Sequence, residues 1–467
     1  MKKLSKVALL LCAMAAGYGG ILPDQRNTVQ ETLVIRVQDE RKQQIRLGID
    51  AERLWHWHSS IKEELADAAV GELQAAFVRI GISAEYERER GIKNEGAYDQ
   101  ILEVMTEMRN INPKIHFFAS PRPMHEAYSR QEKTEIWGHP DNVPFSPFPV
   151  WIQQWHKSGT KKLKGGTVVP RWAKGEFDVE ALVQYYADYL NLMHDKGFVI
   201  TYLDVTNEQT IVTPEHTKYL HEQLPPRLNQ GVSMPKLIAP SSWSVEGGID
   251  WLKAIDRTKG QHLAFAIAAA HNTGSAGDPE VFVREAKRIG KEVWNTELHG
   301  WIGTESEDEI INSAVFWRHL KAGFTGFATW LFYGPIDGRN HTMINSNGKQ
   351  INRSTKYEIF KQVVNNANGG YYVDVSSPSS AIHTAGFIKG DVLSVWVLNT
   401  GDSGFSDAVI RLPREFGMVG ELSAVKWQKQ LPSEGQSFKL EPQTDRFTIR
   451  IDGKSLYFFK IQLVGDG

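Results

Sequence analysis

Between residues 45 and 368 the chain alternates short hydrophobic runs with longer segments of helical periodicity. The runs have the length and the Gly, Pro and Asp boundaries of buried strands, and the segments between them repeat apolar residues every three or four positions. The expected strands are 45–50, 77–85, 114–120, 199–206, 236–240, 263–270, 292–296 and 326–332. The expected helices are 61–78, 98–111, 179–196, 214–228, 279–289 and 307–322. Eight strands in alternation with helices predict an α/β fold, a (β/α)8 TIM barrel over residues 45–369.

Two of the expected helices carry start signals. Pro214 and Pro279 stand where a first helical turn tolerates proline, because the first N–H groups of a helix have no partner within it. Thr213 and Asp278 precede them and have side chains that cap such N–H groups. The sequence therefore predicts helix starts at these two positions.

One connection is much longer than the others. Segment 121–178 follows the third expected strand and is rich in Pro, Trp, His and Gly. Loops of this length in a compact domain are usually functional or disordered, and the many aromatic residues argue against disorder. TIM barrels keep their active sites at the C-terminal ends of their strands, so we interpret segment 121–178 as a wall of a substrate cleft. A purely structural excursion is the alternative.

After residue 369 the pattern changes to short alternating runs separated by Gly, Asp and Ser turns. These runs are 371–375, 381–388, 392–398, 408–412, 424–427, 446–451 and 456–462. They predict a C-terminal antiparallel β-sandwich domain over residues 370–467. Residues 18–44 form an N-terminal segment in which 31–37 also alternate, and these could supply one strand of the sandwich.

The N-terminus has the pattern of an export signal. Lys2, Lys3 and Lys6 precede the apolar run 7–16, which ends in small residues, so residues 1–17 are expected to be a cleaved signal peptide of a secreted or periplasmic protein. Cys12, the single cysteine, lies within this run, and Leu11 is a poor match to the small residue of a lipoprotein signal. A lipid anchor is therefore the less favoured alternative. No other run approaches the roughly 18 apolar residues of a transmembrane helix.

Composition narrows the class of partner. Lys and Arg total 53 against 55 Asp and Glu, and the formal net charge is -2, so a nucleic-acid partner is not expected. The chain has 14 Trp, 14 Tyr and 21 Phe, part of which must be core, and Trp in loops also suits stacking on sugar rings. The sequence has no Gly-rich phosphate loop and no metal-binding motif around His56 and His58, so neither a cofactor nor a metal is expected.

The chemistry is concentrated in two stretches that each lead a hydrophobic run into a glutamate. Residues 203–208 (Leu-Asp-Val-Thr-Asn-Glu) end in Glu208, and residues 293–299 (Val-Trp-Asn-Thr-Glu-Leu-His) contain Glu297. A carboxylate at the tip of a buried strand is costly unless a site uses it. Two such carboxylates, at the ends of the fourth and seventh strands of a barrel, form the pair that glycoside hydrolysis requires. Solvated rim residues are the alternative interpretation.

At these residues the chain resembles the retaining glycoside hydrolases of clan A, which carry an Asn-Glu pair after strand four and a glutamate after strand seven. The resemblance implies that Glu208 is the general acid/base, Glu297 the nucleophile and Asn207 a donor to the sugar 2-hydroxyl. With its appended sandwich the chain looks most like glycoside hydrolase families 30 and 39, and the agarase and porphyranase family 86 is also possible. Those families often continue as Asn-Glu-Pro, whereas Gln209 follows here.

Five further residues are candidates for substrate binding. Trp330 resembles the Trp platform of the clan, and His271 resembles its sixth-strand contact to the nucleophile. Trp243 follows the fifth strand, Trp55 follows the first, and His299 lies two residues after Glu297. Core aromatic residues and hydrogen-bonded structural histidines are the alternatives.

We therefore expect a secreted retaining β-glycoside hydrolase that acts on a polysaccharide or oligosaccharide by double displacement. The substrate remains open among β-glucan, xylan and agarose-like or porphyran-like chains, as do exo or endo action and the oligomeric state. A carbohydrate-binding protein on a degenerate barrel and a transglycosylase are the alternative functions.

Overall fold

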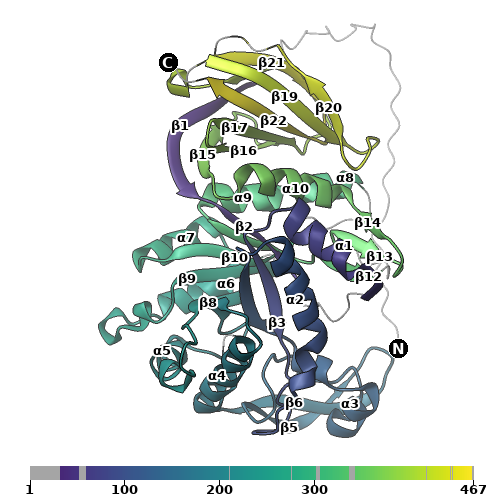
Figure 1. The fold of residues 1–467 in the computed structure, drawn as a ribbon, viewed down its shortest axis with the longest axis vertical. Helices are drawn as coiled ribbons and strands as arrows, with labels where there is room; N and C mark the ends of the chain where they lie inside the picture. The colour runs from purple at the N-terminus through teal and green to yellow at the C-terminus, as the bar shows by residue number, and fades with distance from the viewer. Residues whose placement is uncertain are drawn as a thin grey trace, which may run out of the picture.

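The computed structural model shows two stacked bodies, a helix-covered barrel and a separate sheet (Figure 1). The described residues are 32–51, 59–209, 211–274, 276–300, 306–335, 342–416, 418–441, 443 and 445–464. The expected signal peptide and the candidate Trp55 lie outside them. Within the described residues, no helix is long and apolar enough to cross a membrane.

Eight strands, every neighbouring pair parallel, close into a barrel in the order β10-β11-β2-β3-β4-β7-β8-β9. They are β2 (Arg46–Asp50), β3 (Phe77–Ile82), β4 (His116–Pro121), β7 (Ile200–Asp204), β8 (Lys236–Ser244), β9 (Ile267–Gly274), β10 (Glu292–Leu298) and β11 (Gly326–Thr329). Each overlaps an expected strand, and the predicted TIM barrel is confirmed.

The strand sequences fill the barrel in layers. A hydrophobic layer contains Phe77, Phe118, Tyr202 and Trp294 from four different strands, with Phe77 stacked on Trp294 at 4.9 Å between ring centroids. Because side chains two positions apart on a strand share a face, the next layer holds the residues that follow each of these by two. Those residues are Arg79, Ser120, Asp204 and Thr296, all polar and all buried. The alternation of side chains along the strands thus stacks a buried polar layer directly on a hydrophobic layer inside the barrel.

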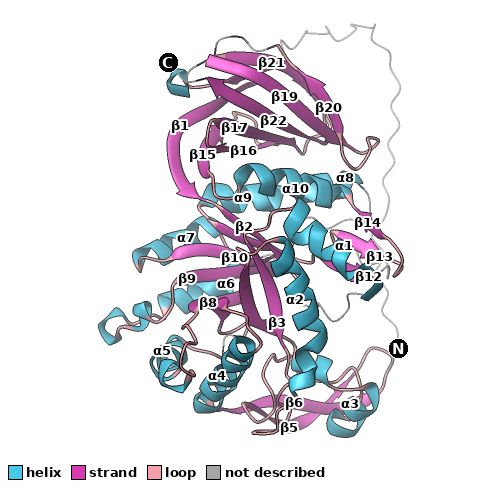
Figure 2. Ribbon diagram, in the orientation of Figure 1, coloured by secondary structure: helices cyan, strands magenta, loops and turns pink. Residues whose placement is uncertain are grey.

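Helices surround the barrel (Figure 2). They are α1 (Lys62–Ala66), α2 (Asp99–Ile111), α4 (Val179–Asp195), α5 (Pro214–Gln223), α6 (Val245–Lys253), α7 (Pro279–Arg288), α8 (Ser306–Asn312), α9 (Ala314–Ala322) and α10 (Thr355–Ala367). Both expected caps are present: the Thr213 hydroxyl accepts from the N–H of His216 at 3.2 Å, and the Asp278 carboxylate accepts from the N–H of Glu280 at 2.9 Å.

The helix predictions differ from the structure at several places. The expected helix 61–78 continues past α1 as a π-helix over Asp67–Glu72 but is wrong beyond Glu72, because β3 begins at Phe77. The expected helix 307–322 is divided at Ser313 into α8 and α9. Helix α6 was not expected because its glycines weaken the helical pattern. Gly248 is needed there, since a Cβ atom would lie 2.6 Å from the Phe282 ring of α7.

The long segment 121–178 is more regular than its composition suggests. It contains helix α3 (Arg130–Trp137) and an antiparallel hairpin of β5 (Gln153–Lys162) and β6 (Val168–Phe177). Ser129 and Glu132 form a capping box at the start of α3. Met124, Tyr128 and Trp137 pack with Ala84 in a small core of their own. The long connection therefore has secondary structure of its own, because it buries aromatic residues and folds.

The second body is one sheet of nine strands in the order β20-β19-β22-β17-β16-β15-β1-β18-β21. These strands are β1 (Val34–Gln44), β15 (Tyr371–Ser376), β16 (Ile382–Lys389), β17 (Val392–Asn399), β18 (Phe405–Arg411), β19 (Met418–Gln428), β20 (Gln436–Lys439), β21 (Arg446–Ile451) and β22 (Ser455–Val464). Strand β1 pairs antiparallel with β15 and parallel with β18, so the sheet is mixed. The expected C-terminal β domain is confirmed, and the N-terminal strand lies within its sheet.

The two bodies share a hydrophobic interface. Trp317 of α9 stacks on Trp396 of β17 at 5.4 Å, and Trp396 stacks on Phe458 at 4.5 Å. Helix α10 lies against the same sheet and buries Tyr357, Phe360 and Val364. A third, small sheet joins β12 (Tyr333–Pro335), β13 (Ile344–Ser346) and β14 (Ile351–Arg353). The aromatic interface fixes the sheet against the barrel.

Candidate active site

The two predicted catalytic glutamates meet in the barrel. Glu208 follows β7, the fourth barrel strand, and Glu297 lies near the end of β10, the seventh. One oxygen of each carboxyl group and one ring nitrogen of His271 all lie within 4.8 Å of one another. The side chains of Glu208 and Glu297 are only 6 % and 10 % exposed, respectively. The two strand-end motifs therefore bring their carboxyl groups to one buried point.

The backbone at Glu208 is bent to deliver its side chain. Asn207 and Glu208 have φ values of 38° and 70°, in the left-handed region that costs a non-glycine residue on the order of 1 kcal/mol. Hydrogen bonds hold this turn in place. The Glu208 N–H donates to the Ser241 carbonyl at 2.8 Å, and the Asp204 carboxylate accepts from the N–H of Asn207 at 3.1 Å. The strand end is thus shaped by polar groups of the same layer.

Glu297 is held by three hydrogen bonds, two at its carboxylate and one at its backbone N–H. Arg79 donates from Nη1 to Oε2 at 2.8 Å, and Nε2 of His299 lies 3.1 Å from Oε1. The Glu297 N–H donates to the Asn295 side chain at 3.1 Å. His299 also stacks on Trp330, with 4.4 Å between ring centroids. These contacts orient both oxygens of the carboxylate and favour its ionised form.

Arg79 is the central cation of the site and was missed from the sequence. It is fully buried and donates to the carboxylate of Asp50, to Ser120 Oγ at 2.8 Å and to Asn207 Oδ1 at 2.7 Å, besides Glu297. Its signal was a lone arginine in an otherwise apolar strand, residues 77–82. A buried arginine needs carboxylate partners, so this strand alone indicated an ionic layer inside the barrel.

The two glutamates have opposite pKa shifts. Burial, followed by the charge of Glu297, raises the pKa of Glu208 to about 8. Burial also acts to raise the pKa of Glu297, but His271, Arg79 and His299 outweigh it and lower that pKa well below its usual range. Burial lowers the pKa of His271 to about 4, so at neutral pH the lasting charge beside Glu297 is that of Arg79. One carboxyl group is therefore protonated and the other ionised.

His271 forms a hydrogen bond with Glu208 whose direction depends on the protonation state of Glu208. Its Nδ1 lies 3.0 Å from Glu208 Oε1, and its Nε2 lies 3.1 Å from Thr296 Oγ1. The Thr296 hydroxyl donates onward to Ser241 Oγ at 3.3 Å, so the hydrogen between Thr296 and His271 belongs to Nε2. Nδ1 is then an acceptor, and the proton of neutral Glu208 is the hydrogen that it accepts. The network favours a protonated Glu208.

The remaining candidates lie around this centre. Asn207 accepts from Arg79 and donates through Nδ2 to the Pro121 carbonyl, which leaves one Nδ2 hydrogen for a ligand. Trp330 follows β11 and stacks on His299. Trp243, at the end of β8, is 48 % exposed, and Phe145 from segment 121–178 is also 48 % exposed. Their rings meet edge to face at 6.3 Å, and Phe145 was not singled out from the sequence.

Glu208, His271 and Glu297 have the ligand types of a metal site and come within 4.8 Å of one another. The guanidinium of Arg79 already pairs with Glu297 Oε2 at 2.8 Å. A divalent cation on that oxygen would face this fixed positive charge without screening by water. The charge of Arg79 therefore disfavours a metal ion between the two glutamates. It leaves room there for a proton on Glu208 and for an uncharged sugar substrate.

No family model matches the chain, and no curated protein matches its sequence. Its fold matches solved structures. A glycoside hydrolase family 30 subfamily 8 xylanase from Clostridium acetobutylicum aligns with a TM-score of 0.66 and 16% identity, covering 92% of this chain and 99% of the xylanase. A GH30 endoxylanase from Clostridium papyrosolvens C71 gives 0.64 and 15%, covering 92% and 100%. The GH51 arabinofuranosidase from Xanthomonas axonopodis pv. citri gives 0.59 and 10%, covering 92% and 100%.

These matches cover both bodies and establish the fold. The chain has the clan A glycoside hydrolase fold, a TIM barrel with an attached β domain. The arrangement of the two bodies is that of the family 30 enzymes, as the sequence resemblance predicted.

Proposed function

We propose that this protein is a retaining β-glycoside hydrolase that acts by double displacement. The observation that carries the proposal is the carboxyl pair, with oxygens within 4.8 Å and opposite pKa shifts. Retaining glycosidases need carboxyl groups about 5 to 5.5 Å apart, whereas inverting enzymes leave about 6.5 to 9.5 Å for a water molecule. The separation here supports retention.

In the first step the Glu297 carboxylate attacks the anomeric carbon, and Glu208 donates its proton to the departing glycosidic oxygen. In the second step Glu208, now ionised, removes a proton from water, and the water oxygen displaces Glu297 from the anomeric carbon. Arg79 keeps Glu297 ionised for attack, and the single remaining Nδ2 hydrogen of Asn207 suits the sugar 2-hydroxyl. Between turnovers, His271 Nδ1 accepts a hydrogen bond from the protonated carboxyl group of Glu208.

We infer that the substrate is a β-linked polysaccharide, with xylan and β-glucan as the first candidates. The exposed ring pair of Trp243 and Phe145 supports an extended sugar chain, and the matched family 30 structures are named as xylanases. Hydrolysis of a panel of xylan, β-glucans, agarose and porphyran by the wild type, with Glu297→Gln as control, tests this. Binding without hydrolysis would contradict the enzyme proposal, and products that grow only with added acceptor sugar would indicate a transglycosylase.

We also propose that residues 1–17 direct export of the protein, because a polysaccharide substrate lies outside the cell. Cleavage after the apolar run would give a mature N-terminus near residue 18. N-terminal sequencing of protein recovered from the native host's medium or periplasm checks this.

The pH profile should follow Glu208. Its proton is needed for leaving-group departure, and its pKa is raised to about 8, so kcat/KM should be level near neutral pH and fall as pH rises through about 8. Glu297 stays ionised far below neutrality and does not cause this basic limb. The measurement is kcat/KM from pH 5 to pH 10. Glu208→Gln, assayed on a substrate with an activated phenolate leaving group, should lack the basic limb, and a limb that persists in this variant would contradict the assignment.

Trp243→Ala should weaken polysaccharide binding. Loss of about 1 kcal/mol of stacking raises KM about fivefold and leaves kcat nearly unchanged, because a ring that only stacks on the sugar chain binds the ground state and the transition state equally. Steady-state kinetics on the polysaccharide measures both constants. Tyr371→Ala is the control, since Tyr371 is 43 % exposed on β15 of the other body. Equal effects of the two substitutions would remove Trp243 from the cleft.

Chelation should leave the rate unchanged. Arg79 supplies the positive charge beside Glu297, so the proposed steps require no cation at the Glu208, His271 and Glu297 cluster. Initial rates before and after dialysis against EDTA measure the dependence. Loss of activity that Zn²⁺ or Mg²⁺ restores would show that the cluster is a metal site.

A further inference from the structure

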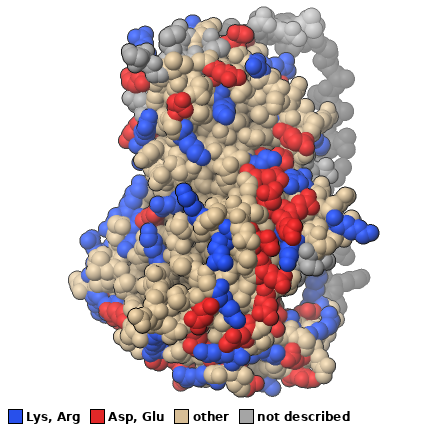
Figure 3. All heavy atoms as spheres, viewed as in Figure 1, with Lys and Arg blue, Asp and Glu red and all other residues tan. Residues whose placement is uncertain are grey.

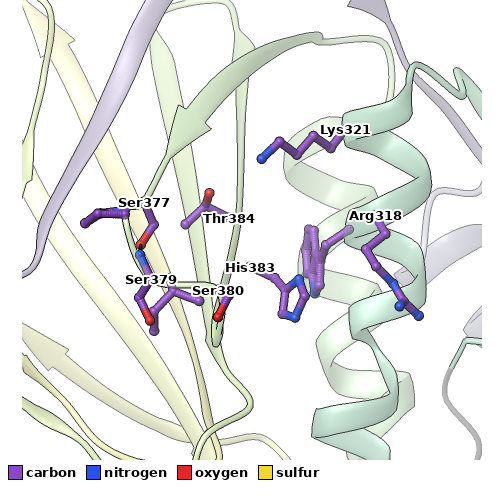
Figure 4. A pocket seen from close by; sticks show the side chains of 10 residues that line it. Arg318, Lys321, Ser377, Ser379, Ser380, His383 and Thr384 are labelled. Atoms are coloured by element: carbon purple, nitrogen blue, oxygen red, sulfur yellow. Dashed lines mark hydrogen bonds between the residues drawn. The ribbon is translucent and has the colours of Figure 1, made fainter. Parts of the chain in front are cut away.

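A hollow of about 330 Å³ lies between α9 of the barrel and the β15–β16 connection of the second body. Figure 4 shows Lys321 reaching from α9 toward the strand, with the His383 ring between strand and helix. Arg318 also lines the hollow, but its side chain leaves α9 on the side opposite Lys321, and its guanidinium group points away from the serines. Two basic residues of α9 and the His383 ring of β16 therefore border the hollow.

The rest of the lining is made of hydroxyl groups and apolar edges. The hydroxyl groups are those of Ser377, Ser379, Ser380 and Thr384, and the apolar lining comes from Trp317, Pro378 and Ile382. No Asp or Glu of the described chain lines the hollow, and none of them forms an ion pair with Arg318 or Lys321. By contrast, carboxylates form a band over α1 and α2 on another part of the surface (Figure 3). Within the described residues, no carboxylate thus compensates the positive charge of Arg318 and Lys321 at the hollow.

The pKa of His383 is affected by the two neighbouring cations. Burial, then the charges of Arg318 and Lys321, lower its pKa below the ordinary value. Both cations are therefore close enough to act on one ring. An anion beside them would be attracted by Arg318 and Lys321, and the neutral His383 ring offers an N–H donor. Hydroxyl donors complete the environment that an oxyanion needs.

We propose that this hollow is an ancillary site for an acidic sugar unit, a ring that carries a carboxylate or a sulfate ester. Its volume lies at the lower end of the range for small-molecule sites, which begins at about 300 Å³, and exceeds the needs of a bare anion. The apolar lining suits the C–H face of a sugar ring. Arg318 also lines a second hollow of about 500 Å³, which His299 of the candidate active site lines as well. The saccharide part rests on the proposed function, and the anion part does not.

Calorimetric titration at pH 7 and low salt tests the site, with methyl β-glucuronoside, methyl β-glucoside and sodium sulfate as probes. The full-length Glu297→Gln variant is the host, so that no probe is hydrolysed. We expect the glucuronoside to bind at least about tenfold more tightly than the other two. Arg318→Gln with Lys321→Gln should lose about tenfold or more, and Lys253→Gln on α6, a matched loss of charge, should lose nothing.

Equal binding of glucoside and glucuronoside, or an equal loss in Lys253→Gln, would overturn the site. Sulfate binding as tight as that of the glucuronoside would overturn the saccharide part and leave a free-anion site. Thermal unfolding of each variant confirms that it is folded. Glucuronoside binding together with failure of every polysaccharide in the hydrolysis panel would reject the proposed function alone, so the two failures are distinguishable.

Discussion

Glu297→Gly should lower kcat on the order of 10⁵-fold while the protein remains folded, because covalent attack on the anomeric carbon has no substitute group. Glu297 is held by Arg79 and His299 and is ionised, so its removal takes away the nucleophile and little else of the substrate cleft. Added azide should restore turnover on an activated β-glycoside and give the α-glycosyl azide. Azide would enter the vacated space and invert the anomeric carbon once.

Glu208→Gly is the matched control for this experiment. Loss of general acid catalysis lowers kcat about 10²- to 10⁴-fold on natural substrates, and less on substrates whose leaving group needs no proton. Azide should then attack the glycosyl enzyme on Glu297 and give the β-glycosyl azide. Rates and product configuration by NMR separate the two roles. If the Glu297 variant gave the β-product and the Glu208 variant the α-product, the roles would be exchanged.

Arg79→Gln should reduce the free energy of unfolding by about 3 to 5 kcal/mol, because it leaves the buried carboxylates of Asp50 and Glu297 without their cation. The pKa of Glu297 should rise without the guanidinium. Activity in the variant is then lost as pH falls through that raised pKa, so the acid limb moves toward neutral pH. Urea unfolding at pH 7 and a pH profile of kcat/KM measure the two effects.

Two variants sharpen the Arg79 experiment. Arg46→Gln removes a barrel-strand arginine whose ion pair with Glu292 is 39% and 32% exposed, and should cost about 1 kcal/mol or less. Arg79→Lys keeps the charge but loses the geometry of the guanidinium, so activity should fall on the order of 10²-fold with a smaller loss of stability. Equal stability of Arg79→Gln and Arg46→Gln would contradict a structural role for the buried cation.

The barrel could be predicted from the sequence because the pattern of each strand is local and is repeated along the chain. Each buried strand reads as a short apolar run, and the two strand-end glutamates mark the fourth and seventh strands. The polar layer was less accessible. Arg79 and Asp50 become partners only when β2 and β3 pair within a closed barrel, and no local pattern joins them to Glu297 more than two hundred positions later.

Elements that depend on tertiary burial were also missed. Helix α10 is covered on both sides by the barrel and the second sheet, so its residues lack a clear polar face. Segment 121–178 resembles a loop in composition, yet it folds around Tyr128 and Trp137 once α3 is capped. Phe145 gains meaning only through its contact with Trp243, which comes from a different strand.

The anomeric configuration of the first product tests the central claim most directly. Proton NMR spectra taken during the first minutes of hydrolysis, on the polysaccharide or oligosaccharide that the panel selects, distinguish the α and β signals before mutarotation mixes them. Two displacements, by Glu297 and then by water, should release the β-anomer first. Initial release of the α-anomer would show a single displacement and contradict a covalent intermediate on Glu297.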